Sequence, residues 1–173
     1  AYSAAVVWAV GTREQVAEWH GHIDADRFGD VLVLLGLYFN TALLAPEAWP
    51  GPGQVTMARI LQLGYSNIYK RMQRSNRSED QLWGWQTDQS SKPQMIHSYA
   101  AAARDFNLVI NSKDLLLEMR SFEYDESGKM GPSLGCYSDR VMAAGIGWHV
   151  SRDIASRPMN EAQKLKNIER HVN

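Results

Sequence analysis

The sequence has little cysteine, no excess of charge of one sign and no long apolar run. Cys136 is the only cysteine, which excludes an internal disulfide and favours a reducing compartment. We interpret it as a small packed residue rather than a nucleophile. The net charge of −1 excludes a polybasic protein that coats nucleic acid. No apolar run approaches the roughly 20 residues of a membrane-spanning helix, so we expect no membrane partner.

The composition is that of an ordinary globular domain. The 173 residues are 45% hydrophobic and 21% charged, enough for one substantial core. We expect one domain at 1–157 and a weakly helical C-terminal tail at 158–173. The strand-like run SAAVVWAV starts at residue 3 with no turn or methionine before it. This start leads us to expect a domain cut from a longer chain, with the cut inside the fold.

Strand-like and helix-like patterns are mixed along the chain. Short apolar, β-branched stretches predict strands, and apolar residues at helical spacing after capping residues predict helices. The expected strands are 3–10, 15–23, 41–46, 67–71, 82–87, 108–110 and 122–125. We expect one helix capped by Asp24 or Asp26 and a second at 54–63. A third is capped by Ser90 or Ser91, a fourth by Ser112, and the last begins at Asp139. The helical connections are long enough for parallel pairing, so the predicted fold class is α/β.

Two carboxylates stand where sites commonly form in open α/β sheets. Glu47 follows the apolar segment 41–46 and precedes the loop PGPG, at the expected carboxyl end of a strand. Asp139 falls in the first turn of an expected helix, where the helix dipole supports a negative charge. Taken alone, a solvated turn explains Glu47 and an ordinary helix-terminal charge explains Asp139. Their spacing gives no independent reason to bring them together.

A longer pattern extends over most of the chain. Its first part, 20–72, contains the segment ending at Glu47, a loop, a helix and then LGYSNIY at 63–69. GWQTDQSSKPQ at 84–94, LLLEMRSF at 115–122 and SDRVMAAGIG at 138–147 follow. In this order the stretches resemble the C-terminal nuclease domain of the large terminase subunit of tailed bacteriophages, in the ribonuclease H-like superfamily.

The resemblance implies a mixed central sheet flanked by helices and a two-metal site. Clustered carboxylates suit Mg²⁺ or Mn²⁺, which prefer oxygen ligands. Glu47 matches the second acid of the family and Asp139 the third, so both are implied as catalytic metal ligands. The implied activity is cleavage of concatemeric double-stranded DNA during genome packaging, in the cytoplasm of an infected or lysogenic bacterial host. The implied partners are an ATPase motor domain earlier in the same polypeptide, the portal and the small terminase subunit.

The chain departs from that family pattern at three places. The first acid-bearing strand has no counterpart, Ser138 stands where a second aspartate often precedes the third acid, and Trp49 replaces an asparagine. We therefore expect a missing strand and an incomplete ligand set. The expected consequence is weak or absent DNA cleavage by this polypeptide alone.

Five basic residues are candidates for DNA contact. Four lie in YKRMQRSNR at 69–77, and the fifth matches a basic position in the family pattern; they are Lys70, Arg71, Arg74, Arg77 and Lys92. An exposed hairpin explains the first four equally well.

Alternative interpretations remain open at this stage. His20, His22 and Asp24 alternate in HGHID and could hold a metal, although a solvated strand face is the favoured reading. The whole chain could also be a non-catalytic DNA-binding or docking module of the packaging motor, or a junction-resolving nuclease of the same superfamily.

Overall fold

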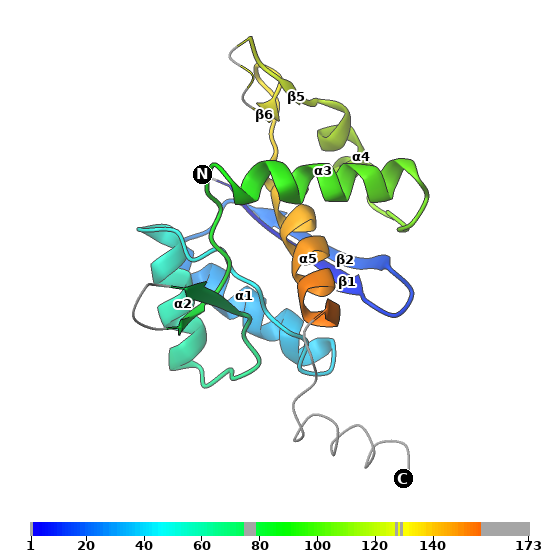
Figure 1. Cartoon of the computed structure of the whole chain (residues 1–173). Coiled ribbons are helices and arrows are strands. Elements are labelled where there is room, and N and C mark those ends of the chain that lie inside the picture. The colour runs from blue at the N-terminus through cyan, green and yellow to red at the C-terminus, as the bar shows by residue number, and fades with distance from the viewer. Residues whose placement is uncertain (1, 75–78, 127, 129, 157–173) are drawn as a thin grey trace, which may run out of the picture.

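The computed structural model describes residues 2–74, 79–126, 128 and 130–156. Figure 1 shows the arrangement of the helices and strands. In chain order they are β1 (Ser3–Ala9), β2 (Glu14–Gly21), α1 (Ala25–Tyr38), α2 (Pro52–Gln62), β3 (Lys70–Arg74), β4 (Glu79–Trp83), α3 (Ser91–Arg104), α4 (Lys113–Arg120), β5 (Phe122–Tyr124), β6 (Met130–Pro132) and α5 (Asp139–Ser156). The expected tail at 158–173 lies outside the described residues. Within the described ranges, no helix combines the length and apolar character needed to cross a membrane.

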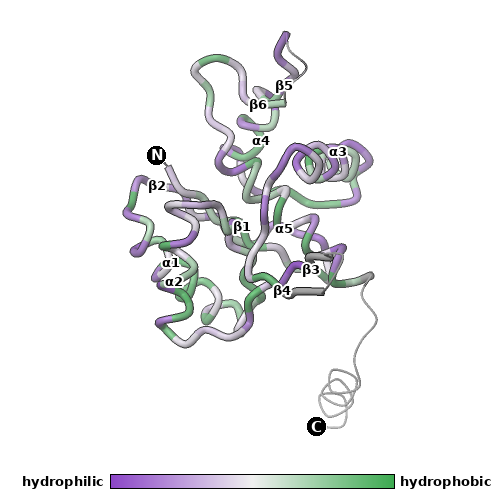
Figure 2. Tube along the Cα trace, turned by 60° about the vertical axis from the view of Figure 1, so that its left-hand side comes forward, coloured by the Kyte–Doolittle hydropathy of each residue, from purple (hydrophilic) through white to green (hydrophobic). Residues whose placement is uncertain are grey.

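The antiparallel β1–β2 hairpin and helix α5 form the centre of the larger core. Ser3 pairs with Gly21 and Ala9 with Glu14, and α5 packs against β1. The helix can lie this close to the strand because residue 147 is a glycine; a β-carbon there would come within 2.7 Å of the Trp8 ring. The Trp8 indole also donates a hydrogen bond to the Ala144 carbonyl. The small residues of α5 therefore set its distance from the hairpin. Figure 2 shows hydrophilic and hydrophobic segments interspersed along the Cα trace.

A second, smaller core lies between α1, α2 and the segment that follows each helix. Its fully buried centre is Ile60 of α2, surrounded by Val33, Leu44, Met57 and other apolar side chains. Leu44 forms a parallel bridge with Ile68, which draws the chain after α1 against the chain after α2. The predicted strand 41–46 is thus an extended segment with isolated bridges rather than a continuous strand. It forms one wall of the site described below.

The strand pairing is divided into three two-stranded sheets among the described residues. Isolated parallel bridges extend it, at Glu14–Val109, Leu44–Ile68 and Glu47–Trp85. The α/β class and the mixed parallel and antiparallel pairing agree with the prediction. The expected continuous central sheet is not formed by these residues, because the β1–β2 hairpin and the extended segment 43–47 are not paired with each other.

Two local expectations were wrong. Cys136 is exposed in the loop before α5 rather than packed. Neither Ser90 nor Ser91 caps α3 through its own hydroxyl; instead, the Asp88 carboxylate accepts hydrogen bonds from the backbone N–H groups of both serines. Both errors concern loops, where the outcome depends on neighbours that the local pattern does not identify.

Gln15 is a buried polar residue that joins β2 to the segment before α4. Its side-chain oxygen accepts hydrogen bonds from the backbone N–H groups of Asn111 (3.1 Å) and Ser112 (3.0 Å), and only 2% of the residue is exposed. We predict that Gln15→Leu lowers the free energy of unfolding by about 1–3 kcal/mol, because two backbone donors lose their acceptor. Urea denaturation measures this loss. Val16→Ala, at the exposed neighbouring position, should change stability by less than about 0.5 kcal/mol, and equal urea midpoints for the two variants would contradict the prediction.

Candidate active site

The backbone of Glu47 is held firmly while its side chain is exposed. The N–H of Ala48 donates to the Trp85 carbonyl (2.7 Å) and the N–H of Trp85 donates to the Pro46 carbonyl (2.9 Å), which fixes the peptide groups on either side. Behind it, a β-carbon at Gly53 would collide with the Glu47 carbonyl oxygen. The Pro-Gly loop therefore brings α2 against the backbone of Glu47, whose side chain stays exposed.

Asp139 begins α5, yet it does not cap the helix. The Glu118 carboxylate of α4 accepts hydrogen bonds from the N–H groups of Arg140 (2.8 Å) and Val141 (3.3 Å). These are donors of the first turn, which have no partner inside the helix. Glu118, rather than Asp139, therefore supplies the acceptor for these first-turn donors. The Asp139 side chain remains 34% exposed.

The Arg140 side chain locks this helix terminus in place. Its guanidinium donates to Glu118 (2.8 Å) on α4 and to Glu18 (2.8 Å) on β2, and all three side chains are at least four-fifths buried. Burial lowers the pKa of Arg140, but the hydrogen bonds to Glu118 and Glu18 outweigh that effect and the pKa lies above its usual value. The ion pairs therefore tie α4, α5 and β2 together beside Asp139.

Glu47 and Asp139, remote in sequence, line the same cavity of about 1020 Å³. The nuclease interpretation requires the two carboxylates to converge, and a shared cavity is one condition for that. Two carboxylates supply the oxygen ligands that hard divalent cations prefer, so their chemistry fits part of a metal site. Among the described residues, however, no group of three His, Cys, Asp or Glu side chains could hold a metal ion. Within the described residues, Glu47 and Asp139 therefore do not by themselves form a complete metal centre.

His20 lies against Asp139, which the sequence did not indicate. Its Nε2 atom is 3.7 Å from an Asp139 carboxylate oxygen and is buried without a hydrogen-bond partner in the described structure. The Tyr2 ring stacks on His20 with centroids 5.0 Å apart, and Tyr137 meets Tyr2 edge to face. The favoured reading of a solvated strand face is therefore wrong for His20, whose side chain is 15% exposed, whereas His22 and Asp24 are exposed.

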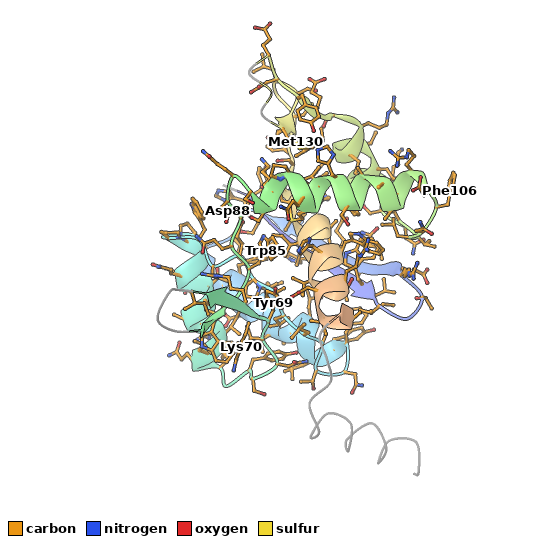
Figure 3. The ribbon with its side chains drawn as sticks, in the orientation of Figure 1. Tyr69, Lys70, Trp85, Asp88, Phe106 and Met130 are labelled. Carbon is orange, nitrogen blue, oxygen red and sulfur yellow. The ribbon has the colours of Figure 1, made fainter. Side chains whose placement is uncertain are left out.

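A second cavity, of about 1070 Å³, is also lined by Glu47. The loop after β4, the start of α3 and the β5–β6 hairpin line it, and Lys92 and Asp88 are among its residues. The Lys92 ammonium donates to the Met130 carbonyl (3.0 Å). Figure 3 shows Asp88 and Met130 near this end of α3. Hydrogen bonds from the N–H groups of Ser91 and Ser90 lower the pKa of Asp88 below its usual value.

The described members of the five basic residues predicted to contact DNA lie in different parts of the structure. Lys92 lines a cavity together with Glu47, whereas Lys70 and Arg71 lie on β3 and line neither cavity. The Lys70 ammonium lies over the Trp83 ring, 4.2 Å from its centroid, and Arg71 donates to the Gly84 carbonyl. Figure 3 shows Lys70 well away from Met130. The side chain of Arg74 and the whole of Arg77 lie outside the described part of the chain.

The hairpin, the flanking helices and the parallel-bridged segment ending at Glu47 form a mixed α/β fold that is shared with solved nuclease structures. Solved structures that share it include those of the large terminase nuclease from thermophilic phage G20c, alone, with bound magnesium and with bound cobalt, at TM-scores of 0.64, 0.66 and 0.62. Each is 18% identical to this chain and aligns over 86% of this chain and 74% of the other. No protein-family model and no curated protein matches the sequence. The predicted resemblance is thus confirmed at the level of the fold.

We predict that Glu118→Ala lowers the free energy of unfolding by about 3–5 kcal/mol, because it leaves the buried Arg140 partly unpaired and two helix N–H groups without an acceptor. Urea denaturation again measures the effect. Asp114→Ala is the matched control: it also removes a carboxylate paired with Arg140, but one that is 65% exposed, and should cost less than about 1 kcal/mol. Similar losses for both variants would show that Glu118 does not anchor α5.

Proposed function

We propose that this chain is the nuclease domain of a phage or prophage terminase large subunit, which hydrolyses phosphodiester bonds of concatemeric double-stranded DNA during packaging. The observation that carries the proposal is the common cavity of Glu47 and Asp139 within a terminase-nuclease fold. The G20c nuclease structures with magnesium and cobalt support a divalent metal as cofactor. We propose Mg²⁺ or Mn²⁺, bound as two ions.

The residues of this chain would act mainly by binding the metal ions and by keeping the ligand side chains in position. Glu47 and Asp139 would each offer carboxylate oxygens to metal, and the Glu118–Arg140 pair would keep Asp139 at a fixed position. When bound, two ions can activate a water molecule and stabilise the leaving oxygen of a phosphodiester. His20, close to one Asp139 oxygen, would orient that carboxylate from behind, as partners outside the ligand shell commonly do.

DNA would be bound through its phosphates rather than its base edges, which makes sequence specificity low. Lys92, in the cavity that also contains Glu47, is the basic residue best placed to contact a phosphate near the site. Lys70 and Arg71 would contact the duplex farther from Glu47, and Arg74 and Arg77 remain candidates for phosphate contact. The partners in this proposal are an ATPase motor domain in the same polypeptide, the portal and the small terminase subunit, in the bacterial host cytoplasm.

A non-catalytic DNA-binding or docking module is the second candidate. The observation that favours it is the lack, among described residues, of a third side chain able to complete a metal site. Titration calorimetry with Mn²⁺ separates the two functions. A nuclease site binds ions through Glu47, so the binding heat disappears in Glu47→Ala, whereas a docking module gives no Mn²⁺-dependent heat in either protein.

We predict that Glu47→Ala and Asp139→Asn in the full-length enzyme each lower the rate of DNA cleavage by about 10³-fold, because each removes a ligand from ions that supply several kcal/mol of transition-state stabilisation. Stability should change by about 0.5 kcal/mol or less for Glu47→Ala, whose side chain is exposed. A plasmid-nicking assay with Mn²⁺ measures the rate, and thermal unfolding measures the stability.

The matched control is Asp26→Ala, which removes an exposed carboxylate from the first turn of α1 and should leave cleavage unchanged. If both variants still cleave DNA at the wild-type rate, the assignment of Glu47 and Asp139 as catalytic residues is wrong.

We predict that the double variant Lys70→Gln, Arg71→Gln weakens DNA binding equally for all sequences. The slope of log affinity against log salt concentration should fall by about 2, because each phosphate contact contributes about 1. Fluorescence anisotropy at several salt concentrations gives the slope. Arg104→Gln removes one charge from an exposed site at the end of α3 and is the control. A slope that changes no more in the double variant than in this control would place the duplex elsewhere.

A further inference from the structure

Trp49 differs from the other five tryptophans of the chain. The residue is 51% exposed, and within the described ranges no hydrogen bond or ring contact engages its indole. Each of the others has an indole hydrogen bond, a neighbouring ring or a cation over its ring; they are Trp8, Trp19, Trp83, Trp85 and Trp148. A large aromatic side chain gains free energy when it is taken out of water. Packing within the fold therefore does not explain the position of Trp49.

Trp49 lies beside the candidate active site. It follows Glu47 by two positions, and among the described residues these two line both cavities. The first cavity contains Asp139, and the second contains Lys92. A DNA strand with one phosphate at Glu47 that continues into the second cavity would therefore pass Trp49.

The second cavity combines the groups that recognise a nucleotide. Trp49 and Tyr124, which is 55% exposed, offer aromatic surface, and Lys92 adds a positive charge. The Asp88 carboxylate is also in the lining, but it accepts two backbone N–H groups at the start of α3. The volume of about 1070 Å³ is that of a large small-molecule site, which has room for a nucleotide. Aromatic side chains bind every kind of base, since each base has a π-face, and lysine binds phosphate.

Stacking on a side chain requires a base that has left the duplex. In paired DNA both faces of a base are covered by its neighbours, so a protein ring reaches a face only when the base is unpaired or unstacked. We propose that Trp49 stacks on one unpaired nucleobase next to the phosphate that is cut, inside the second cavity, with Lys92 at the adjacent phosphate. The inference rests on the proposed function and deepens it. Cleavage would be favoured where the duplex is locally open, whichever base is there.

Two duplexes of about 20 base pairs test the inference on the 173-residue chain. One is fully paired, and the other has a central bubble of a few unpaired nucleotides with 2-aminopurine in the middle. A third probe has an abasic sugar in place of the 2-aminopurine. Fluorescence anisotropy should show that the bubble binds about tenfold more tightly than the paired duplex, since stacking on one aromatic ring contributes about that factor. The abasic probe should lose this advantage, and 2-aminopurine emission should be quenched on binding.

Variants of the chain test the contribution of the indole. Trp49→Ala should weaken binding of the bubble about tenfold, leave the paired duplex within about twofold and abolish the quenching. Trp49→Phe keeps a ring and should retain most of the preference. Phe106→Ala is the matched control, because it removes a ring that is 92% exposed just beyond the end of α3, away from Asp88 and Met130 (Figure 3). It should change neither affinity. Thermal unfolding checks that all variants are folded.

The outcomes separate this inference from the proposed function. Equal affinity for the bubble and the paired duplex, or a preference that survives Trp49→Ala or the abasic sugar, would overturn the inference and leave the proposed function intact. Equal weakening of both duplexes by Trp49→Ala would place the indole against paired DNA and also overturn it. If the preference depends on Trp49 while the Glu47→Ala enzyme still cleaves DNA, the base-binding site stands and the catalytic assignment fails. If neither duplex binds, both proposals fail.

Discussion

One buried carboxylate, Glu118, determines where helix α5 begins. It accepts hydrogen bonds from two N–H groups of the first turn and from the Arg140 guanidinium, which also donates a hydrogen bond to Glu18 on β2. Burying charges is costly unless each is paired and hydrogen-bonded, so this set of three side chains is stable in essentially one arrangement. α4, α5 and the β-hairpin are therefore held in fixed relation, and Asp139 is held with them. Because Glu118 supplies the carboxylate at the start of α5, the Asp139 carboxylate is available for another role.

The regular elements were largely predictable from local pattern, and the contacts between them were not. Apolar spacing located α1, α2 and α3 to within a few residues, and α5 begins at the predicted Asp139. The Gln15 side chain, by contrast, is buried by partners almost 100 positions away, and nothing near it in sequence signals that burial. The same applies to His20, which became a neighbour of Asp139 through the register of a hairpin.

In the candidate site, too, local pattern did not identify which residues lie together. Glu47 and Asp139 were paired by resemblance to a family and not by their spacing, since each alone has an ordinary structural explanation. Local charge does not indicate which basic residue lies near Glu47: Lys70 and Arg71 belong to the conspicuous basic cluster, whereas the isolated Lys92 shares a cavity with Glu47. A count of charges along the chain carries no information about their distance from a site, because that distance depends on how the helices pack.

The exposure of Cys136 has a practical consequence. It is the only thiol in the chain, and it lies three residues before Asp139 in the loop that enters α5. Thiol-directed reagents can therefore attach a single fluorophore or spin label beside the candidate site without prior removal of other cysteines. Such a label would follow the surroundings of Asp139 in solution through its emission or its rotational freedom.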